Sequence, residues 1–199
     1  MKTCANPTNP LNAGPPVRAL LAAMNDWIAN GTLPPDSRYP SRADATLAPP
    51  WASAVGFPKI PSFAYPSRIA QPTALKSDGM PSSKGAAYPV FVPKTDADGR
   101  DIAGIHLPTL EVPAATHTGW NLRKAGFSEG ELCDNNGSMM PSAATREERL
   151  KINDPRLSME ERYPNAGDRA AAIAKATREL IDDRLLLEED AGLFIASSN

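Results

Sequence analysis

The chain contains one short pattern typical of a catalytic serine, Gly126-Phe127-Ser128-Glu129-Gly130, which matches G-x-S-x-G. In enzymes that use this motif, a sharp turn from strand to helix exposes the serine hydroxyl. Here residues 121–125 are not an apolar strand, and residues 131–140 contain Asn135-Asn136-Gly137 rather than a helical pattern. The context therefore predicts a glycine-rich surface turn at Ser128.

A serine is a poor nucleophile without a positioned base, and histidine is the usual base. His106 and His117 both precede Ser128, whereas in the fold that carries this motif the histidine follows the serine. We therefore predict no catalytic residue in this chain. The alternative, a triad of His117, an aspartate and Ser128, would require a different fold altogether.

Acidic residues occur in four adjacent pairs, but adjacent residues on a helix do not face each other. We predict that these pairs are solvated or cap helices: Glu147 with Glu148, Glu160 with Glu161, Asp182 with Asp183, and Glu188 with Glu189. Asp96, Asp98 and Asp101 resemble part of a calcium loop, yet the later glutamate of such loops is missing. The sequence predicts a turn there, and no metal or cofactor site.

Cys4 and Cys133 are the two cysteines, and neither lies in a C-x-x-C motif or near a suitably spaced histidine. This predicts two free thiols and no zinc site. The net charge of -2, from 21 basic and 23 acidic residues, favours neither nucleic acid nor an anionic membrane as a partner. No apolar run approaches the roughly 18 residues of a membrane span.

Proline is frequent: the chain has 21 prolines, most of them between Pro34 and Pro113. Because proline fixes φ and lacks a backbone donor, this stretch cannot form a central sheet or a long helix. We predict that residues 32–141 are an irregular proline-rich wrap, ordered by packing along another domain. Turn signals at 77–79 and 96–99 punctuate it, and the runs 88–92 and 102–107 around the second turn predict a short hairpin over 88–107.

A helix is predicted from Val17 to Asn30, after an irregular segment at 1–16. Pro15 and Pro16 suit its first turn and Gly31 suits its end. Its apolar residues share one face by their spacing: Val17, Leu20, Leu21, Met24, Trp27 and Ile28. Such a face is expected to be buried, although no strong β-run lies nearby in the sequence to cover it.

Helical signals return in a C-terminal segment at 142–199. Thr145 to Glu148 and Ser158 to Glu161 each match the capping box. The longest helix is predicted over 167–186, with one face formed by Ile173, Thr177, Leu180, Ile181 and Leu185. A last helical turn is expected at 190–196, so the chain should contain about four helices.

The block from Thr116 to Arg123 combines small, aromatic and polar residues. Gly119 permits a tight turn that lets Trp120 pack, while Asn121 and Arg123 can bond backbone carbonyls. We predict a structural role for Gly119, Trp120, Asn121 and Arg123 in preference to ligand contact.

Four blocks occur in an order that resembles the C-terminal region of a family of esterase-like proteins described as "alpha/beta hydrolase domain". The blocks are Arg18-Ala19-Leu20-Leu21, the segment from Pro34 to Pro40, the segment from Ala115 to Arg123, and Glu160-Glu161-Arg162-Tyr163. They recur between about residues 9 and 193. The resemblance implies an α/β fold, of which this chain is the C-terminal part and residues 17–31 are the last core helix.

In this family the nucleophilic serine and the triad histidine are expected upstream of the block near Asn9-Pro10. At His106 and His117 the family more often has a basic residue and an aromatic, which argues against either as the triad base. The resemblance thus implies a structural part of a carboxylic-ester hydrolase, inactive alone, whose partner is the N-terminal catalytic portion and whose full-length relative acts on a small ester. The alternative is a non-catalytic interaction module that docks through helix 17–30 and the proline-rich wrap.

Overall fold

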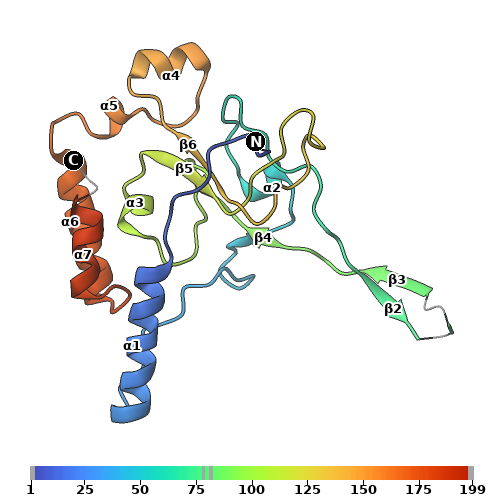
Figure 1. Ribbon diagram of the computed structural model, residues 1–199, viewed down its shortest axis with the longest axis horizontal. Helices are drawn as coiled ribbons and strands as arrows, with labels where there is room; N and C mark the ends of the chain where they lie inside the picture. The colour runs from blue at the N-terminus through green and yellow to red at the C-terminus, as the bar shows by residue number, and fades with distance from the viewer. Residues whose placement is uncertain (1–2, 78, 81–82, 197–199) are drawn as a thin grey trace.

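The computed structural model describes residues 3–77, 79–80 and 83–196, and it combines helices with short strands in a mixed α/β arrangement (Figure 1). The helices are α1 (Gly14–Asn30), α2 (Ala52–Val55), α3 (Pro108–Glu111), α4 (Arg146–Ile152), α5 (Met159–Arg162), α6 (Asp168–Asp182), η1 (Glu188–Asp190) and α7 (Ala191–Ile195). The strands are β1 (Leu47–Ala48), β2 (Thr73–Lys76), β3 (Ser83–Ala87), β4 (Val92–Pro93), β5 (Ala115–Thr118) and β6 (Ser138–Pro141). The described residues thus hold more helices than the four expected, because single turns such as α2 and α3 lack the periodicity that predicts a helix.

The strands of the described residues form three antiparallel pairs, β1 with β4, β2 with β3, and β5 with β6. The β5–β6 pair lies at the centre, with Ala115 opposite Pro141 and Thr118 opposite Ser138. The N-terminal segment runs beside β6, since the Met139 amide donates to the Pro7 carbonyl (3.0 Å). The segment from Thr3 to Asn9 is therefore anchored on the centre of the fold.

The proline-rich region differs from the predicted hairpin over 88–107. The turn forms, because the Asp96 amide donates to Arg100 (2.8 Å) and the Ile102 amide to Lys94 (2.9 Å). The run 88–92 does not pair with 102–107, however: β4 pairs with β1, and the Tyr88 amide donates to Pro72. Distant strands supply the partners, which local turn signals cannot reveal.

Part of the turn signal at 77–79 lies outside the described residues. Strands β2 and β3, on either side of it, form an arm that extends from the body in Figure 1.

Helix α1 begins at Gly14, three residues before the expected start, with prolines in its first turn. It ends at Gly31, whose φ of 75° is the left-handed conformation that glycine tolerates best. Its buried residues are small, namely Pro15, Pro16, Ala19 and Ala23. The expected burial of the large apolar face is wrong for the residues described, because that face is exposed. No helix among the described residues has the length and apolar character that a bilayer crossing needs.

The C-terminal helices follow the sequence signals closely. Both predicted capping boxes are confirmed, with the Glu148 amide donating to the Thr145 hydroxyl and the Glu161 amide donating to Ser158. Helix α6 ends at Asp182, four residues earlier than expected. Arg184 adopts a φ of 60°, and the Leu185 amide donates back to the Leu180 carbonyl at 2.8 Å. This reversal turns Leu185 and Leu186 into the core, which explains why their apolar character extended the predicted helix.

Two separate apolar cores stabilise the fold. One lies between α3, α6 and α7 and contains Leu107, Val112, Ile173, Ala176, Leu180, Leu185, Leu186 and Phe194. The other is formed within the proline-rich region and contains Ala48, Val55, Phe57, Ile60 and Phe63. Met140 of β6 packs on this second core, whereas Tyr163, which follows α5, packs on the first.

Candidate functional site

Ser128 lies in an exposed turn with left-handed backbone, at a φ of 60°. The Phe127 amide donates to Lys124 (3.1 Å) and the Glu131 amide donates to the Ser128 carbonyl (3.2 Å). The residues before the turn form isolated bridges rather than a strand of a sheet, and no helix follows it among residues 129–140. The two elements that support a nucleophile elbow are therefore absent around Ser128.

The two histidines lie in different surroundings. His106 Nδ1 lies 3.4 Å from Glu111 Oε2. His117 is on β5, its Nδ1 is buried without a hydrogen-bond partner in the described residues, and burial lowers the pKa of its imidazole. His117 lines two cavities, and Ser128 lines neither of them. The alternative triad of His117 and Ser128 thus gains no geometric support, and the absence of a catalytic residue stays a prediction.

The block from Thr116 to Arg123 makes many internal contacts. The Trp120 ring centroid lies 5.2–5.8 Å from the rings of Phe63, Tyr65 and Phe57. Buried Asn121 donates from Nδ2 to the Asn6 carbonyl (3.0 Å), and its Oδ1 accepts from the Leu122 amide (2.9 Å). Arg123 Nε donates to the Leu132 carbonyl at 3.3 Å. These contacts agree with a structural role for the block, which remains a prediction.

Cys4 and Cys133 form a disulfide, so the prediction of two free thiols is wrong. Their Cα atoms lie 5.6 Å apart, a normal distance for a disulfide. Two backbone contacts bring them together: Cys4 forms a β-bridge with Arg123, and the Cys133 amide donates to the Asn121 carbonyl (2.8 Å). Because this pairing depends on tertiary contacts, cysteine spacing alone does not predict it.

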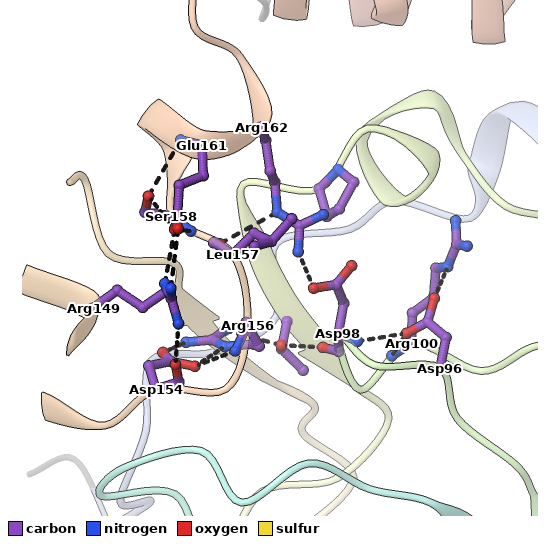
Figure 2. Close-up of polar contacts among 12 residues, drawn as sticks. Asp96, Asp98, Arg100, Arg149, Asp154, Arg156, Leu157, Ser158, Glu161 and Arg162 are labelled. Carbon is purple, nitrogen blue, oxygen red and sulfur yellow. Dashed lines mark hydrogen bonds and ion pairs between the residues drawn. The ribbon is translucent and has the colours of Figure 1, made fainter. Parts of the chain in front are cut away.

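A network of arginines and carboxylates connects the central strands to the C-terminal helices (Figure 2). Arg156 lies at its centre, with only 2% of its side chain exposed, and forms two hydrogen bonds to the Asp154 carboxylate. Its Nη1 also donates to Thr116 Oγ1 (2.9 Å) and to the Met140 carbonyl (2.8 Å). A buried charge pair is tolerated only when its remaining donors are also satisfied, and the strand carbonyls satisfy them here.

Two of the three aspartates considered for calcium, Asp96 and Asp98, belong to this network. Asp96 binds Arg100 at 3.0 Å, and Asp98 forms an ion pair with Arg162 of α5. The Asp96 carboxylate also accepts the amides of Asp98 and Arg100, as expected for a turn. The described residues contain no group of three or more side chains suited to a metal ion.

Glu161 connects the two capped helices, as Figure 2 shows. Arg149 donates to its carboxylate from Nε (2.7 Å) and Nη2 (3.0 Å), and the Ser158 amide donates to it at 3.0 Å. The hydrogen bonds from Arg149, followed by that from the Ser158 backbone, lower the pKa of Glu161 to about 2. The Glu160-Glu161-Arg162-Tyr163 block thus joins helix capping to the arginine network.

Helix α1 exposes a large apolar surface. Its large apolar side chains, defined here as the α1 face, are all at least 39% exposed: Val17, Leu20, Leu21, Met24, Trp27 and Ile28. The opposite side is attached to the C-terminal region, where Arg18 pairs with Asp190 and Asp26 pairs with Arg184. The large apolar side chains of α1 are thus left uncovered by the described residues.

Sequence reasoning missed two features, namely the buried Arg156–Asp154 pair and a cavity that Arg169 lines. Buried arginines are rare, so composition gives no reason to place Arg156 inside the fold. The Asn153-Asp154-Pro155-Arg156 segment offered the only local hint, since proline and asparagine favour a turn that brings neighbouring side chains together.

Short antiparallel strands, helices and a proline-rich connection define a mixed α/β protein without an assembled catalytic triad among the described residues. The model of the family described as "Alpha/beta hydrolase domain" matches residues 1–196, so the chain belongs to that family. No curated protein and no solved structure matches the chain significantly.

Proposed function

We propose that this chain is the C-terminal, non-catalytic portion of an α/β hydrolase that acts on a carboxylic ester. Its family membership supports the hydrolase class, and the exposed α1 face is the observation that carries the structural role. The catalytic portion, with the nucleophile and its histidine, covers the α1 face. In this arrangement α1 is the last core helix, and residues 32–141 pack along the catalytic portion.

The size of the exposed side chains supports docking of α1 on an apolar surface. Ile28 is 76% exposed and Leu21 is 53% exposed, whereas the buried side of the helix offers only alanine and proline. Burial of large aliphatic and aromatic side chains contributes about 1.5–3 kcal/mol each. The α1 face therefore exposes larger apolar side chains than those that α1 buries against the rest of this chain.

The activity of the chain alone tests the non-catalytic part of the proposal. Purified chain and its Ser128→Ala variant are assayed with p-nitrophenyl acetate and p-nitrophenyl butyrate. We expect no turnover above the buffer rate for either protein, because Ser128 has no positioned base. Turnover in the parent chain that Ser128→Ala abolishes would contradict the proposal.

The docking part is tested with the gene and with matched variants. The nucleotide sequence for about a kilobase upstream of Met1 is read in three frames for a G-x-S-x-G motif followed by a histidine. If it is found, the two portions are co-expressed, and we expect Leu21→Glu to reduce their co-purification and esterase activity. Leu150→Glu on α4 is the matched control, since Leu150 has a similar exposure of 50%.

The second candidate function is a free-standing interaction module, and the same exposed α1 face motivates it. In that case the upstream DNA contains a promoter and a stop codon and no serine motif. Binding partners are then identified as proteins whose co-purification with the chain is reduced by Leu21→Glu. Equal co-purification of the Leu21→Glu and Leu150→Glu variants would contradict both docking functions.

A further inference from the structure

A cavity of about 490 Å³ lies where six segments of the chain meet. The segment before α1 contributes Leu11, β5 contributes His117, β6 contributes Met139, and α6 and α7 contribute Arg169 and Leu193. Leu107 and Phe194 of the C-terminal core also line it. Its volume is within the range typical of small-molecule sites, and its walls are mostly apolar.

Two buried nitrogen atoms in the walls of this cavity, Nε of Arg169 and Nδ1 of His117, have no well-aligned hydrogen bond in the part of the chain described. The Ala115 backbone still interacts with the His117 imidazole and partly offsets the lowering of its pKa by burial, so Arg169 is the less satisfied of the two. Buried polar atoms are normally paired, so each unpaired one calls for an explanation. No contact within the described residues accounts for these atoms, and the cavity leaves room beside both residues.

The charge of Arg169 is also uncompensated. In the described residues no ion pair joins it to a carboxylate, whereas its neighbour Asp168 accepts hydrogen bonds from Asn165 (2.9 and 3.0 Å). Other arginines of the C-terminal region, such as Arg149 and Arg178, do have acidic partners. A half-buried cation without a carboxylate partner beside an apolar cavity is suited to pair with an anion from outside the chain.

We propose that this cavity binds a monocarboxylate with an apolar chain, whose carboxylate pairs with Arg169 and hydrogen-bonds to His117. The planar guanidinium suits a carboxylate in a bidentate arrangement. The imidazole supplies one further polar contact, and Leu11, Leu107 and Leu193 enclose the apolar chain. This site does not depend on the docking of the α1 face.

The apolar walls favour a monocarboxylate over a small inorganic oxyanion. A free phosphate would bind one arginine but leave most of the cavity without suitable contacts, and phosphate sites usually combine several cationic or amide donors. Here Arg169 is joined by three uncharged polar side chains, Asn12, Thr109 and His117, and the other lining residues are leucine, proline, alanine, methionine and phenylalanine. Fatty acids of medium chain length have the matching distribution of polar and apolar groups.

Calorimetric titration of the full chain with octanoate tests the proposal, with octylamine as a probe of the same chain length and opposite charge. We expect octanoate to bind and octylamine to bind far more weakly. Arg169→Gln should weaken octanoate about tenfold to a hundredfold, the effect of losing a hydrogen bond to a charged group. Arg178→Gln is the matched control on the exposed side of α6 and should leave the affinity unchanged.

A second variant keeps the test informative if Arg169→Gln fails to fold. Leu193 is 56% exposed, so Leu193→Asp should fold and repel the carboxylate at the cavity wall. We expect it to weaken octanoate and to spare octylamine. Absence of octanoate binding, equal binding of the two probes, or displacement of octanoate by inorganic phosphate at similar concentration would overturn the proposal.

Discussion

Helices α1 and α6 have similar apolar periodicity but opposite environments. On α6 the apolar residues are buried, with Ile173 at 0% exposure, and α3 and α7 pack against them. On α1 the large apolar residues are exposed, and only Ala19 and Ala23 face the body of the protein. Periodicity therefore identifies an apolar face in both helices, but it does not show whether this chain supplies the surface that covers it.

The contrast between α1 and α6 distinguishes residues that stabilise this chain from residues that are available for docking. Helix α6 contributes to the free energy of unfolding through its own core, since its face is already covered. Helix α1 is expected to contribute little through its large residues until a partner covers them. Substitutions on the two helices should consequently have different readouts, and the predictions below are arranged from the largest expected effect to the smallest.

Truncation of the α6 core has the largest expected effect. Ile173→Ala should lower the free energy of unfolding by about 2–5 kcal/mol, because it removes fully buried methyl groups and leaves a cavity. Leu21→Ala on α1 is the matched control and should change it by less than about 0.5 kcal/mol. Urea unfolding followed by circular dichroism measures both, and similar losses for the two variants would contradict the contrast.

Loss of the disulfide comes next. The double variant Cys4→Ser/Cys133→Ser should lower the free energy of unfolding by about 2–4 kcal/mol, since the bond restricts the unfolded chain over a long loop. Differential scanning calorimetry with and without a reducing agent measures the effect. The parent should approach the variant on reduction, and an unchanged parent would argue against the bond. Because disulfides persist in oxidising compartments, a confirmed bond favours a secreted or periplasmic setting.

The capped helix α4 is an intermediate case, because none of its residues is buried. Thr145→Ala should cost about 1 kcal/mol, since it removes the hydroxyl that accepts the Glu148 amide. Thr145→Ser retains that hydroxyl and should restore most of the stability. If the serine variant is as unstable as the alanine variant, the loss arises from packing rather than from capping.

The smallest effect at neutral pH is expected from titration of Glu161, because its carboxylate is fully ionised there. The folded pKa is about 2, below the ordinary value of 4.5, so the contribution of the carboxylate is complete above pH 4.5 and is lost as the pH falls toward 2. Glu161→Gln should flatten the pH dependence of stability in this interval. Glu147→Gln is the control on α4, and an identical flattening in both variants would contradict the assignment to Glu161.

Local signals predicted the C-terminal helices well. The capping residues Thr145 and Ser158 and the spacing of Ile173, Thr177 and Leu180 depend on groups within one or two turns, and the structure agrees with them. The end of α6 was predicted too late, because the apolar pair Leu185 and Leu186 resembles another helical turn. Their burial instead follows from the left-handed backbone of Arg184.

Interactions between distant segments could not be predicted in the same way. The predicted hairpin over 88–107 forms only next to its turn, where Thr95 pairs with Asp101, because the earlier strand β4 pairs with β1. The free thiols were wrong for the related reason that cysteine spacing carries no information on which strands meet. The candidate cavity was not foreseen, since its walls come from six separate segments.

The sequence by itself determined where helices begin, which faces are apolar, and that the region rich in proline lacks long regular elements. Each of these depends on backbone and side-chain preferences within a few residues. Tertiary structure decided the disulfide, the strand pairs, the burial of Arg156 and the position of Arg169 beside a cavity. Those features depend on contacts between residues far apart in the chain, and their formation is governed by packing of the whole molecule rather than by local preference.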